Sequence, residues 1–472
     1  MLKRLSESER FWKWQHIGLA LGLALASIAC APATDTSADA GPFAELPFAP
    51  GDCGLPAYEW LPPTDVGDVV FADAHPLSPI RQEDIAAILD DAGLSEIGPA
   101  EHGVEIFKLR YGTQDRGERV EATGLVAIPS LAPGTSPADF PVLVWLHGTT
   151  GFTGACAPSR LGGDNLGFAL LASLGFVVVA PDYIGLDADL PAGELPPVTH
   201  AYLGLEQVAL GTLDMVRAAK VLLAEIPTPV VPDATTILWG GSQGGHAAFS
   251  VDRLIPYYAP ELDVVGMVAL VPPTDLNAQA VYATTTLNEA SGALPGMMTS
   301  LSRWHNQFDA LSSALQSEGP VNFPEEIPQL MDTSCDFSSF ADGVDSLDDI
   351  YTPSFLAEQD DFLNATTWGC ILRRNSILDT DIPLKSATPT LFQISQLDTL
   401  VDANSERKGF EKLCAQGYRL HFLECADAGH TQGALWSLPE QLSFIRARLG
   451  QGPDEAAPEC EVQAPVRCQG MP

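Results

Sequence analysis

The chain has 472 residues, and 61 Asp plus Glu against 24 Lys plus Arg give it a formal net charge of −37. Hydrophobic residues make up 46% and charged residues 18%, which is close to a globular norm and excludes a disordered chain or a membrane protein with many spans. A field this negative repels a phosphate backbone, so we expect no nucleic-acid partner. The length fits about two to four domains, or one large α/β domain with insertions.

The N-terminus has the pattern of an export signal. Four basic residues lie within residues 1–16 and an apolar run follows at residues 17–28, so we assign residues 1–29 to a signal peptide. The run leads into Cys30 in a way that resembles a bacterial lipoprotein cleavage site, although Ser27 stands where a branched aliphatic residue is usual. We therefore expect a lipidated Cys30 that anchors the chain to a membrane of the cell envelope. Ordinary signal peptidase cleavage, which would give a secreted protein, is the alternative.

The cysteine count also favours an oxidising compartment. Of nine cysteines, eight remain once Cys30 is set aside, and an even number suits disulfide bonds. Eight cysteines allow on the order of 100 pairings. Proximity in the sequence favours Cys414 with Cys425, Cys460 with Cys468, Cys335 with Cys370 and, as the remaining pair, Cys53 with Cys156. Metal binding is the weaker alternative, because the spacings lack the C-x-x-C pairs of a zinc ribbon, and we expect no metal site.

The middle of the chain alternates between strands and helices. Residues 30–52 predict a flexible tether, and residues 53–103 form an N-terminal extension. The predicted strands are residues 104–110, 119–128, 141–146, 176–180, 235–239, 264–271, 390–394 and 419–423, the first two as an antiparallel pair. The predicted helices are residues 203–226, 244–254, 403–416 and 439–449. This alternation predicts an α/β fold with a mostly parallel, doubly wound sheet that helices cover on both faces.

The alternation is interrupted once. It runs through residues 104–275, stops, and resumes at residues 388–450. Residues 276–387 carry helical stretches with exposed-looking apolar residues between Leu294 and Leu311, and we interpret them as an inserted helical cap. An extension of the core is the alternative, because a stripe of Met and aromatic residues is more often core than lid. Residues 451–472 predict a disulfide-linked C-terminal tail.

A candidate nucleophile lies between a predicted strand and a predicted helix. Residues 240–244 read Gly-Gly-Ser-Gln-Gly, a G-x-S-x-G pattern. A nucleophile on a sharp strand-to-helix turn needs small neighbours, because its backbone is strained and the flanking chains pack closely. Gly240 and Gly244 meet this need on either side of Ser242. A serine hydroxyl also needs a base to take its proton and an acid to fix the tautomer of that base.

The base and the acid are expected in the order Ser, acid, His, each just after a strand. Asp398 follows the strand at residues 390–394, and His430 follows the strand at residues 419–423. Asp402 and Asp427 are the competing acids. We prefer Asp398, because Asp402 has the position of a helix N-cap and Asp427 is too near His430 in the sequence to reach its ring from another strand end.

The oxyanion of the attacked carbonyl needs two preorganised N–H donors. One is predicted to be the amide of Gln243, directly after the nucleophile. The other is predicted in the loop after the strand at residues 141–146, which reads His-Gly-Thr-Thr-Gly, and we place it on the amide of Thr149. A plain Gly-rich turn is the alternative for this loop.

Residues 141–187 and 200–246 resemble the secretory lipase family of α/β-hydrolases. The stretches that carry the resemblance are His147-Gly148-Thr149, Cys156-Ala157-Pro158-Ser159, Asp182-Tyr183-Ile184-Gly185-Leu186 and the Gly-x-Ser-Gln-Gly-Gly at 240–245. The resemblance implies an α/β-hydrolase fold, a helical cap inserted before the acid, and activity on carboxylic esters, acylglycerols included, without a metal. The cap shows little that matches, and Gly241 stands where many lipases have Tyr or His, so acyl-chain preference does not carry over.

The sequence thus predicts serine ester hydrolysis by a lipase or carboxylesterase that acts on an ester or lipid substrate without a cofactor. A prolyl-type serine peptidase is one alternative, since residues 53–103 have room for about one propeller blade. A non-catalytic, surface-binding lipoprotein on a hydrolase fold is the other. Such a module has no need of an intact Ser, Asp, His and oxyanion loop. The sequence leaves the oligomeric state open.

Overall fold

The computed structural model describes residues 46–47, 52–73, 76–91, 98–132, 134–160, 166–190, 194–336, 343–359, 362 and 367–470. The predicted signal peptide, Cys30 and most of the predicted tether lie outside the described residues. Within these ranges no helix is both long enough and apolar enough to cross a bilayer.

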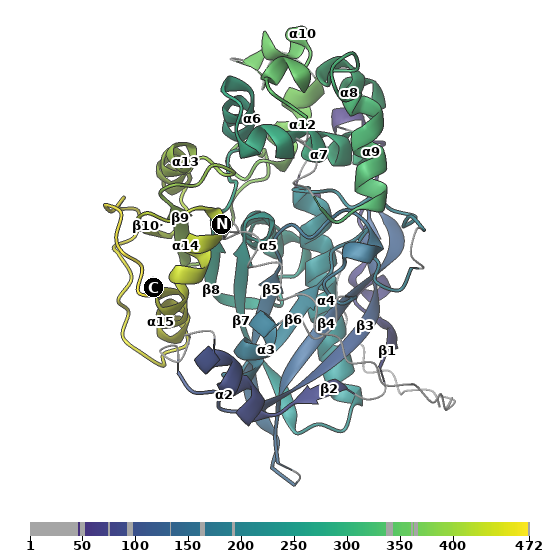
Figure 1. The fold of residues 1–472 in the computed structure, drawn as a ribbon. Helices are drawn as coiled ribbons and strands as arrows, with labels where there is room; N and C mark the ends of the chain where they lie inside the picture. Colours follow the sequence, from purple (N-terminus) through teal and green to yellow (C-terminus); the bar gives the residue numbers. More distant parts are fainter. Residues whose placement is uncertain are drawn as a thin grey trace, which may run out of the picture.

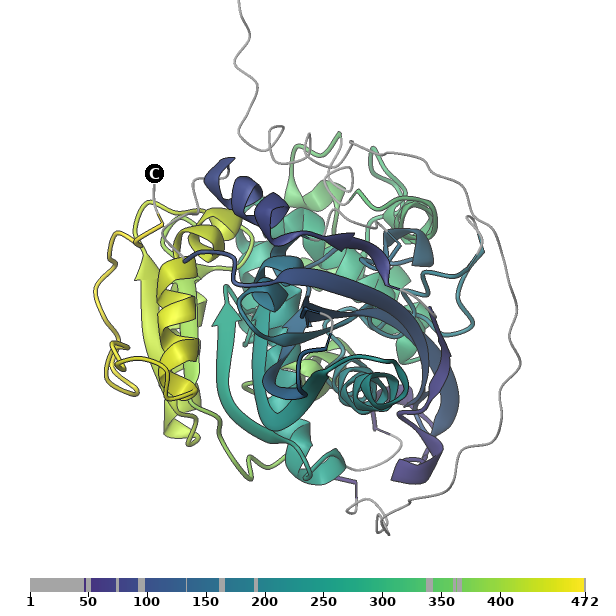
Figure 2. The same ribbon diagram turned by 90° about the horizontal axis from the view of Figure 1, so that it is seen from below.

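A single mixed sheet of ten strands forms the centre of the molecule (Figure 1). Its strands, in spatial order, are β1 (Val69–Ala72), β3 (Gly103–Asp115), β4 (Glu118–Ser130), β6 (Val177–Pro181), β5 (Ala138–Leu146), β7 (Val230–Gly241), β8 (Asp263–Leu270), β9 (Thr390–Ser395) and β10 (Leu420–Cys425), with β2 (Leu77–Ile80) also paired to β3. The strands from β6 to β10 are parallel, and β1, β3 and β4 are antiparallel to their neighbours. The predicted α/β-hydrolase fold is confirmed. Seen from below, the sheet curves from the C-terminal strands at one edge to the N-terminal strands at the other (Figure 2).

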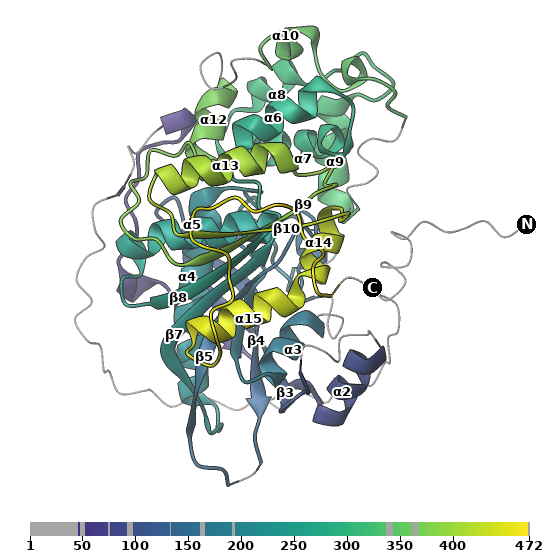
Figure 3. The ribbon, with the colours of Figure 1, turned by 90° about the vertical axis from the view of Figure 1, so that its left-hand side faces the viewer.

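Helices cover both faces of this sheet (Figure 3). One apolar core joins one face to α4 (Leu205–Glu225), α5 (Gln243–Tyr258) and α13 (Ala403–Ala415). The other joins the opposite face to α2 (Gln82–Asp91), α3 (Leu166–Ser173) and α15 (Leu438–Arg448). All residues of β6 and β9 are buried, because strands between two helical layers are covered on both faces. A short helix, α14 (His430–Trp436), follows β10.

The N-terminal extension belongs to the same sheet. The short 3-10 helices η2 (Asp52–Gly54) and η3 (Pro63–Asp65) precede β1. Both β1 and β2 then pair antiparallel with β3. In its described part, the extension therefore widens the hydrolase sheet instead of forming a propeller blade.

The predicted cap lies between β8 and β9 and stands above the carboxyl ends of the parallel strands (Figure 1). Its helices are α6 (Leu276–Thr285), α7 (Glu289–Trp304), α8 (Phe308–Ala314), α9 (Phe323–Thr333), η8 (Leu347–Asp349), α10 (Pro353–Leu356) and α12 (Thr367–Asn375). The apolar stripe that looked exposed is mostly buried in an apolar core that the cap shares with Phe152 and Leu203 of the sheet domain. Phe308 alone in that stripe is exposed, at 60%.

Four disulfides are present, and all the predicted pairings are wrong. The bonds join Cys53 to Cys370, Cys156 to Cys335, Cys414 to Cys460 and Cys425 to Cys468. Proximity in the sequence failed because each bond connects separate layers of the fold. Two bonds tie the cap to the sheet domain, and the other two tie the C-terminal tail to α13 and β10.

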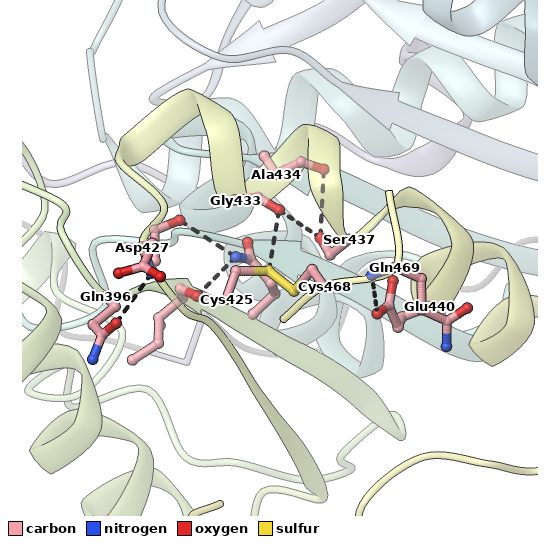
Figure 4. The surroundings of a disulfide bond; sticks show 12 residues. Gln396, Cys425, Asp427, Gly433, Ala434, Ser437, Glu440, Cys468 and Gln469 are labelled. Carbon is pink, nitrogen blue, oxygen red and sulfur yellow. Dashed lines mark hydrogen bonds between the residues drawn. A yellow bond between two sulfur atoms is a disulfide. The ribbon is translucent and has the colours of Figure 1, made fainter. Parts of the chain in front are cut away.

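The C-terminal tail covers the edge strand β10. Backbone amides of Cys460 and Val466 donate to carbonyl oxygens of β10 at 2.7 and 2.9 Å. Figure 4 shows the Cys425–Cys468 disulfide beneath α14, where Cys425 Sγ lies 3.5 Å from the carbonyl oxygen of Gly433. The tail therefore supports the junction of β10 and α14 and shields a strand edge that would otherwise be open to another chain.

Candidate active site

Ser242 occupies a strained turn between β7 and α5. Its φ of 57° and ψ of −119° place it in a backbone conformation that residues other than glycine rarely adopt. Its amide donates to the carbonyl oxygen of Leu270 at 2.8 Å. A Cβ at Gly240 would overlap the carbonyl oxygen of Gly244, and one at Gly244 would overlap that of Leu146. The two glycines therefore allow the close approach that the turn requires.

The three residues predicted as nucleophile, base and acid lie together. His430 Nε2 is 2.9 Å from Ser242 Oγ, and His430 Nδ1 is 2.7 Å from Asp398 Oδ2. Ser242 and His430 are half-buried, whereas the Asp398 side chain is 2% exposed. They come from the loops after β7, β9 and β10, whose carboxyl ends meet at one edge of the parallel sheet.

The competing acids occupy other positions. Asp402 caps α13, where its side chain accepts from the amide of Ser405 at 2.9 Å. Asp427 has a φ of 55° and donates its amide to Gln396 Oε1 at 3.1 Å. Asp398 is the carboxylate that contacts the His430 ring.

The two predicted oxyanion donors flank the nucleophile. Gln243 is the first residue of α5, so its amide belongs to the unpaired N–H groups of a helix N-terminus. Across the site, a Cβ at Gly148 would lie 3.9 Å from Ser242 Cβ, which brings the loop containing Thr149 against the nucleophile. The Thr149 hydroxyl lies 2.8 Å from the hydroxyl of Tyr202. Tyr202 could not be predicted from the sequence, since an isolated Tyr before a helix carries no motif.

Buried polar side chains support the loop that contains Thr149. The His147 ring stacks on Tyr183, with centroids 4.1 Å apart, and its Nε2 lies 3.2 Å from the carbonyl oxygen of Asp182. Burial lowers the pKa of His147 to about 4, so the ring is neutral near pH 7. Asp182 accepts hydrogen bonds from Thr123 Oγ1 and the Ser159 amide, both at 2.7 Å, and burial raises its pKa to about 6. The Asp-Tyr-Ile-Gly-Leu stretch thus serves as a framework for the site.

Two cavities lie away from these residues. One, of about 370 Å³, borders Phe140 and Phe176 at the amino ends of β5 and β6, which is the opposite edge of the sheet. The other, of about 490 Å³, lies beside Glu206, Arg374 and the Cys53–Cys370 disulfide. In the described part of the chain, no group of three or more His, Cys, Asp or Glu side chains is placed to hold a metal ion.

Comparisons with protein families and characterised sequences both find lipases. The sequence model of the secretory lipase family matches residues 161–455. A curated relative named Lipase A, from Arthroderma benhamiae, is 29% identical over 293 residues, which cover 58% of this chain and 53% of that protein. The chain therefore spans about half the length of this relative.

Solved structures share the fold at low sequence identity. The rice cell wall degrading esterase LipA from Xanthomonas oryzae has a TM-score of 0.65 and 21% identity, covering 81% of this chain and 97% of that one. A putative hydrolase from Legionella pneumophila has the same TM-score and identity, covering 81% and 98%. Lipase A from Candida antarctica in its closed state has a TM-score of 0.59 and 18% identity, covering 85% and 86%.

Proposed function

The chain belongs to the secretory lipase family of ester hydrolases, and from that premise we propose that it cleaves carboxylic esters through an acyl-enzyme formed on Ser242. The observation that carries the proposal is the hydrogen-bonded series from Ser242 Oγ through the His430 ring to Asp398, with distances of 2.9 and 2.7 Å. Such a series requires that its three residues lie together at the carboxyl ends of the parallel strands, and the contacts meet that requirement.

In the proposed mechanism, His430 Nε2 takes the proton of Ser242 as the hydroxyl attacks the ester carbonyl. Asp398 accepts from Nδ1, which fixes the tautomer in which Nε2 is the base and stabilises the imidazolium that forms. His430 then passes the proton to the leaving alcohol. In the second half of the reaction His430 activates a water molecule, which releases the acid and restores Ser242.

We assign the oxyanion to the amides of Gln243 and Thr149. Each donor of this kind is worth about 3 to 4 kcal/mol of transition-state stabilisation. The support is the placement of Gln243 at the start of α5 and of the Gly148–Thr149 loop against Ser242. No cofactor enters any step of this scheme.

The substrate is proposed to be an ester or a lipid, and the chain is either a lipase or a carboxylesterase. Hydrolysis of p-nitrophenyl esters from acetate to palmitate, with Ser242→Ala beside the wild type, tests this. We expect the substitution to lower kcat by about six orders of magnitude. Activity rising toward long chains would mean a lipase, and activity confined to short chains a carboxylesterase.

Covalent labelling with a fluorophosphonate probe is the second measurement. We expect folded wild-type protein to be labelled at Ser242 and the Ser242→Ala protein to remain unlabelled. Failure of the wild type both to label and to turn over any ester would overturn the proposal and favour a binding role. Cleavage of prolyl peptides faster than esters would favour a peptidase instead.

We also propose that the chain is exported and that Cys30 carries a lipid. The eight described cysteines pair with one another, so none of them is available for a disulfide with Cys30. Metabolic labelling with an alkyne fatty acid should mark the wild type and not the Cys30→Ser variant. Equal labelling of both would contradict lipidation at this residue.

A further inference from the structure

One short segment contacts both residues to which we assign the oxyanion. It comprises residues 200–202, just before α4. His200 Nε2 lies 2.9 Å from the side-chain amide nitrogen of Gln243, and the Tyr202 hydroxyl lies 2.8 Å from the hydroxyl of Thr149. The segment therefore contacts the side chains of both residues whose backbone amides are assigned to the oxyanion.

The chemistry of the His200 ring fixes the direction of its contact. Nδ1 faces the carbonyl oxygen of Ile184 at 3.2 Å, so Nδ1 must carry the hydrogen and donate it. Nε2 is then an acceptor, and the side-chain amide of Gln243 donates to it. Burial lowers the pKa of His200 to about 3, so the ring remains neutral and the contact persists at ordinary pH.

The contact between Tyr202 and Thr149 also has a preferred direction. Either hydroxyl can donate in this contact. A phenol is more acidic than an aliphatic alcohol and is therefore the better donor, so we assign the donor role to Tyr202 and the acceptor role to Thr149 Oγ1. Within the described residues, Tyr202 is the hydrogen-bond partner of this hydroxyl. With its oxygen accepting from Tyr202, the Thr149 hydroxyl keeps its hydrogen for another acceptor. The loop that carries it lies against the nucleophile, because a Cβ at the neighbouring Gly148 would be 3.9 Å from Ser242 Cβ.

The backbone of the segment is held by the cap. The Ser300 hydroxyl, buried on α7, donates to the carbonyl oxygen of His200 at 2.5 Å and accepts from the amide of Tyr202 at 2.8 Å. Between them, the amide of Ala201 donates to Gln207 Oε1 at 2.7 Å. One cap serine thus fixes the residues on either side of Ala201, and with them the side chains that contact Gln243 and Thr149.

We propose that the hydroxyl of Thr149 is a third oxyanion donor, that Tyr202 is the positioning residue that orients it, and that Ser300 makes this arrangement depend on the cap. The inference rests on the proposed ester hydrolysis and deepens it. It gives the cap a role in catalysis, because a cap residue holds part of the machinery that stabilises the transition state.

Substitutions of the two hydroxyls test the proposal by steady-state kinetics on a p-nitrophenyl ester. We expect Thr149→Val to lower kcat by about 100-fold, as the loss of one oxyanion donor does, and Thr149→Ser to restore most of it. Tyr202→Phe should lower kcat by about tenfold, the effect of one ordinary hydrogen bond. In both cases KM should change little, because the ground-state carbonyl carries no full charge.

A double variant separates action through Thr149 from a merely structural role. If Tyr202 acts by orienting the Thr149 hydroxyl, then adding Tyr202→Phe to Thr149→Val should cause no further loss. The matched control is Tyr257→Phe, which removes a hydroxyl that donates to the carbonyl oxygen of Pro383 at 2.8 Å on the far end of α5. That control should keep the wild-type kcat.

Inhibitor affinity provides a measurement that does not depend on turnover. A trifluoromethyl ketone forms a tetrahedral oxyanion on the nucleophile, so its affinity should fall in Thr149→Val and Tyr202→Phe in parallel with kcat/KM. We expect Ser300→Ala to lower the affinity for this inhibitor as well. Wild-type kcat and inhibitor affinity in Tyr202→Phe, or fully additive losses in the double variant, would overturn the inference. Absence of Ser242-dependent turnover in the wild type would instead overturn the proposed function.

Discussion

Asp398 and His430 lie 32 positions apart in the sequence, and Asp398 Oδ2 is 2.7 Å from His430 Nδ1. The other oxygen of the same carboxylate accepts from the amides of Leu400 and Val401, both at 2.9 Å. The loop after β9 therefore fixes the orientation of the carboxylate through its own backbone. The His430 ring meets an acceptor that is already in place, which lowers the reorganisation needed as the imidazolium forms.

This relationship predicts which acid matters for activity. Asp398→Asn should lower kcat by about 10⁴-fold, because an amide at this position favours the wrong tautomer of His430. Asp402→Asn is the matched control, since Asn caps a helix as well as Asp does, and we expect it to retain activity within about twofold. Steady-state kinetics on one p-nitrophenyl ester, with thermal unfolding to check the fold, would decide. A loss in Asp402→Asn as large as that in Asp398→Asn would contradict the assignment.

The strained turn at Ser242 makes a prediction about stability. A Cβ at Gly244 would overlap the backbone oxygen of Leu146, whereas a Cβ at Gly241 would lie 3.7 Å from Leu270 Cβ, an ordinary contact. Gly244→Ala should therefore destabilise the fold by about 3 kcal/mol or more, and Gly241→Ala should change the free energy of unfolding by less than about 1 kcal/mol. Chemical denaturation of both variants measures this. Similar stabilities for the two would show that the turn relaxes more readily than its contacts indicate.

The sequence predicted those parts of the site that follow from local order along the chain. Each of Ser242, Asp398 and His430 comes just after an apolar run, and parallel strands bring their carboxyl ends to one edge. The choice of Asp398 over Asp402 rested on the same local order, and Asp402 is the N-cap of the helix that follows it, whereas Asp398 contacts His430.

Contacts between distant parts of the chain could not be predicted in this way. Cys53 and Cys370 are separated by 317 positions, and no periodic pattern encodes their approach. The same holds for Ser300, which reaches His200 from the cap across 100 positions. The apolar stripe on α7 was ambiguous for another reason, since a helix that packs on its own domain and one that faces a substrate carry the same spacing.

The disulfide between Cys156 and Cys335 should affect activity as well as stability. A Cβ at Gly151, in the predicted oxyanion loop, would overlap Cys156 Sγ, so this bond packs directly against the loop. Replacing both cysteines by Ala should cost about 2 to 5 kcal/mol of stability and lower kcat. Replacing Cys414 and Cys460 should cost stability with little change in kcat, because that bond joins α13 to the tail.

Mass spectrometry of peptides from the unreduced protein checks the pairing itself. Peptides that join Cys156 to Cys335 and Cys425 to Cys468 should be found. A peptide that joins Cys414 to Cys425 would contradict the arrangement. Equal kcat values in the two double-alanine variants would argue that the Cys156–Cys335 bond has no specific effect on the loop.

The burial of Glu406 leads us to predict that the free energy of unfolding depends on pH. It is fully buried on α13, where the Thr274 hydroxyl donates to Oε2 at 2.5 Å and the Gln279 amide donates to Oε1 at 2.9 Å. Burial, with a smaller contribution from the charge of Asp275, raises its pKa from an ordinary 4.5 to about 8.

The sign of the effect follows from proton binding. Below about pH 4.5 the carboxyl is protonated in both the folded and the unfolded chain, so its stabilising contribution is fully present. Between pH 4.5 and 8 the unfolded chain loses this proton while the folded chain keeps it, and the contribution falls by at most about 1.4 kcal/mol per pH unit. Above about pH 8 the folded chain also loses the proton and the contribution is gone.

Glu406→Gln should remove this contribution to the pH profile, because the amide keeps the shape and does not ionise. We expect its free energy of unfolding to decline less than that of the wild type between pH 5 and pH 8, as measured by urea denaturation across about this range. Glu411→Gln, on the exposed side of the same helix, should follow the wild-type profile. If the wild type and Glu406→Gln lose stability in parallel, the Glu406 carboxyl ionises at its ordinary pH in the folded chain. In that case Gln279 of α6 would donate to an ionised Glu406 carboxylate. The pH dependence of the free energy of unfolding would then have to come from other buried groups.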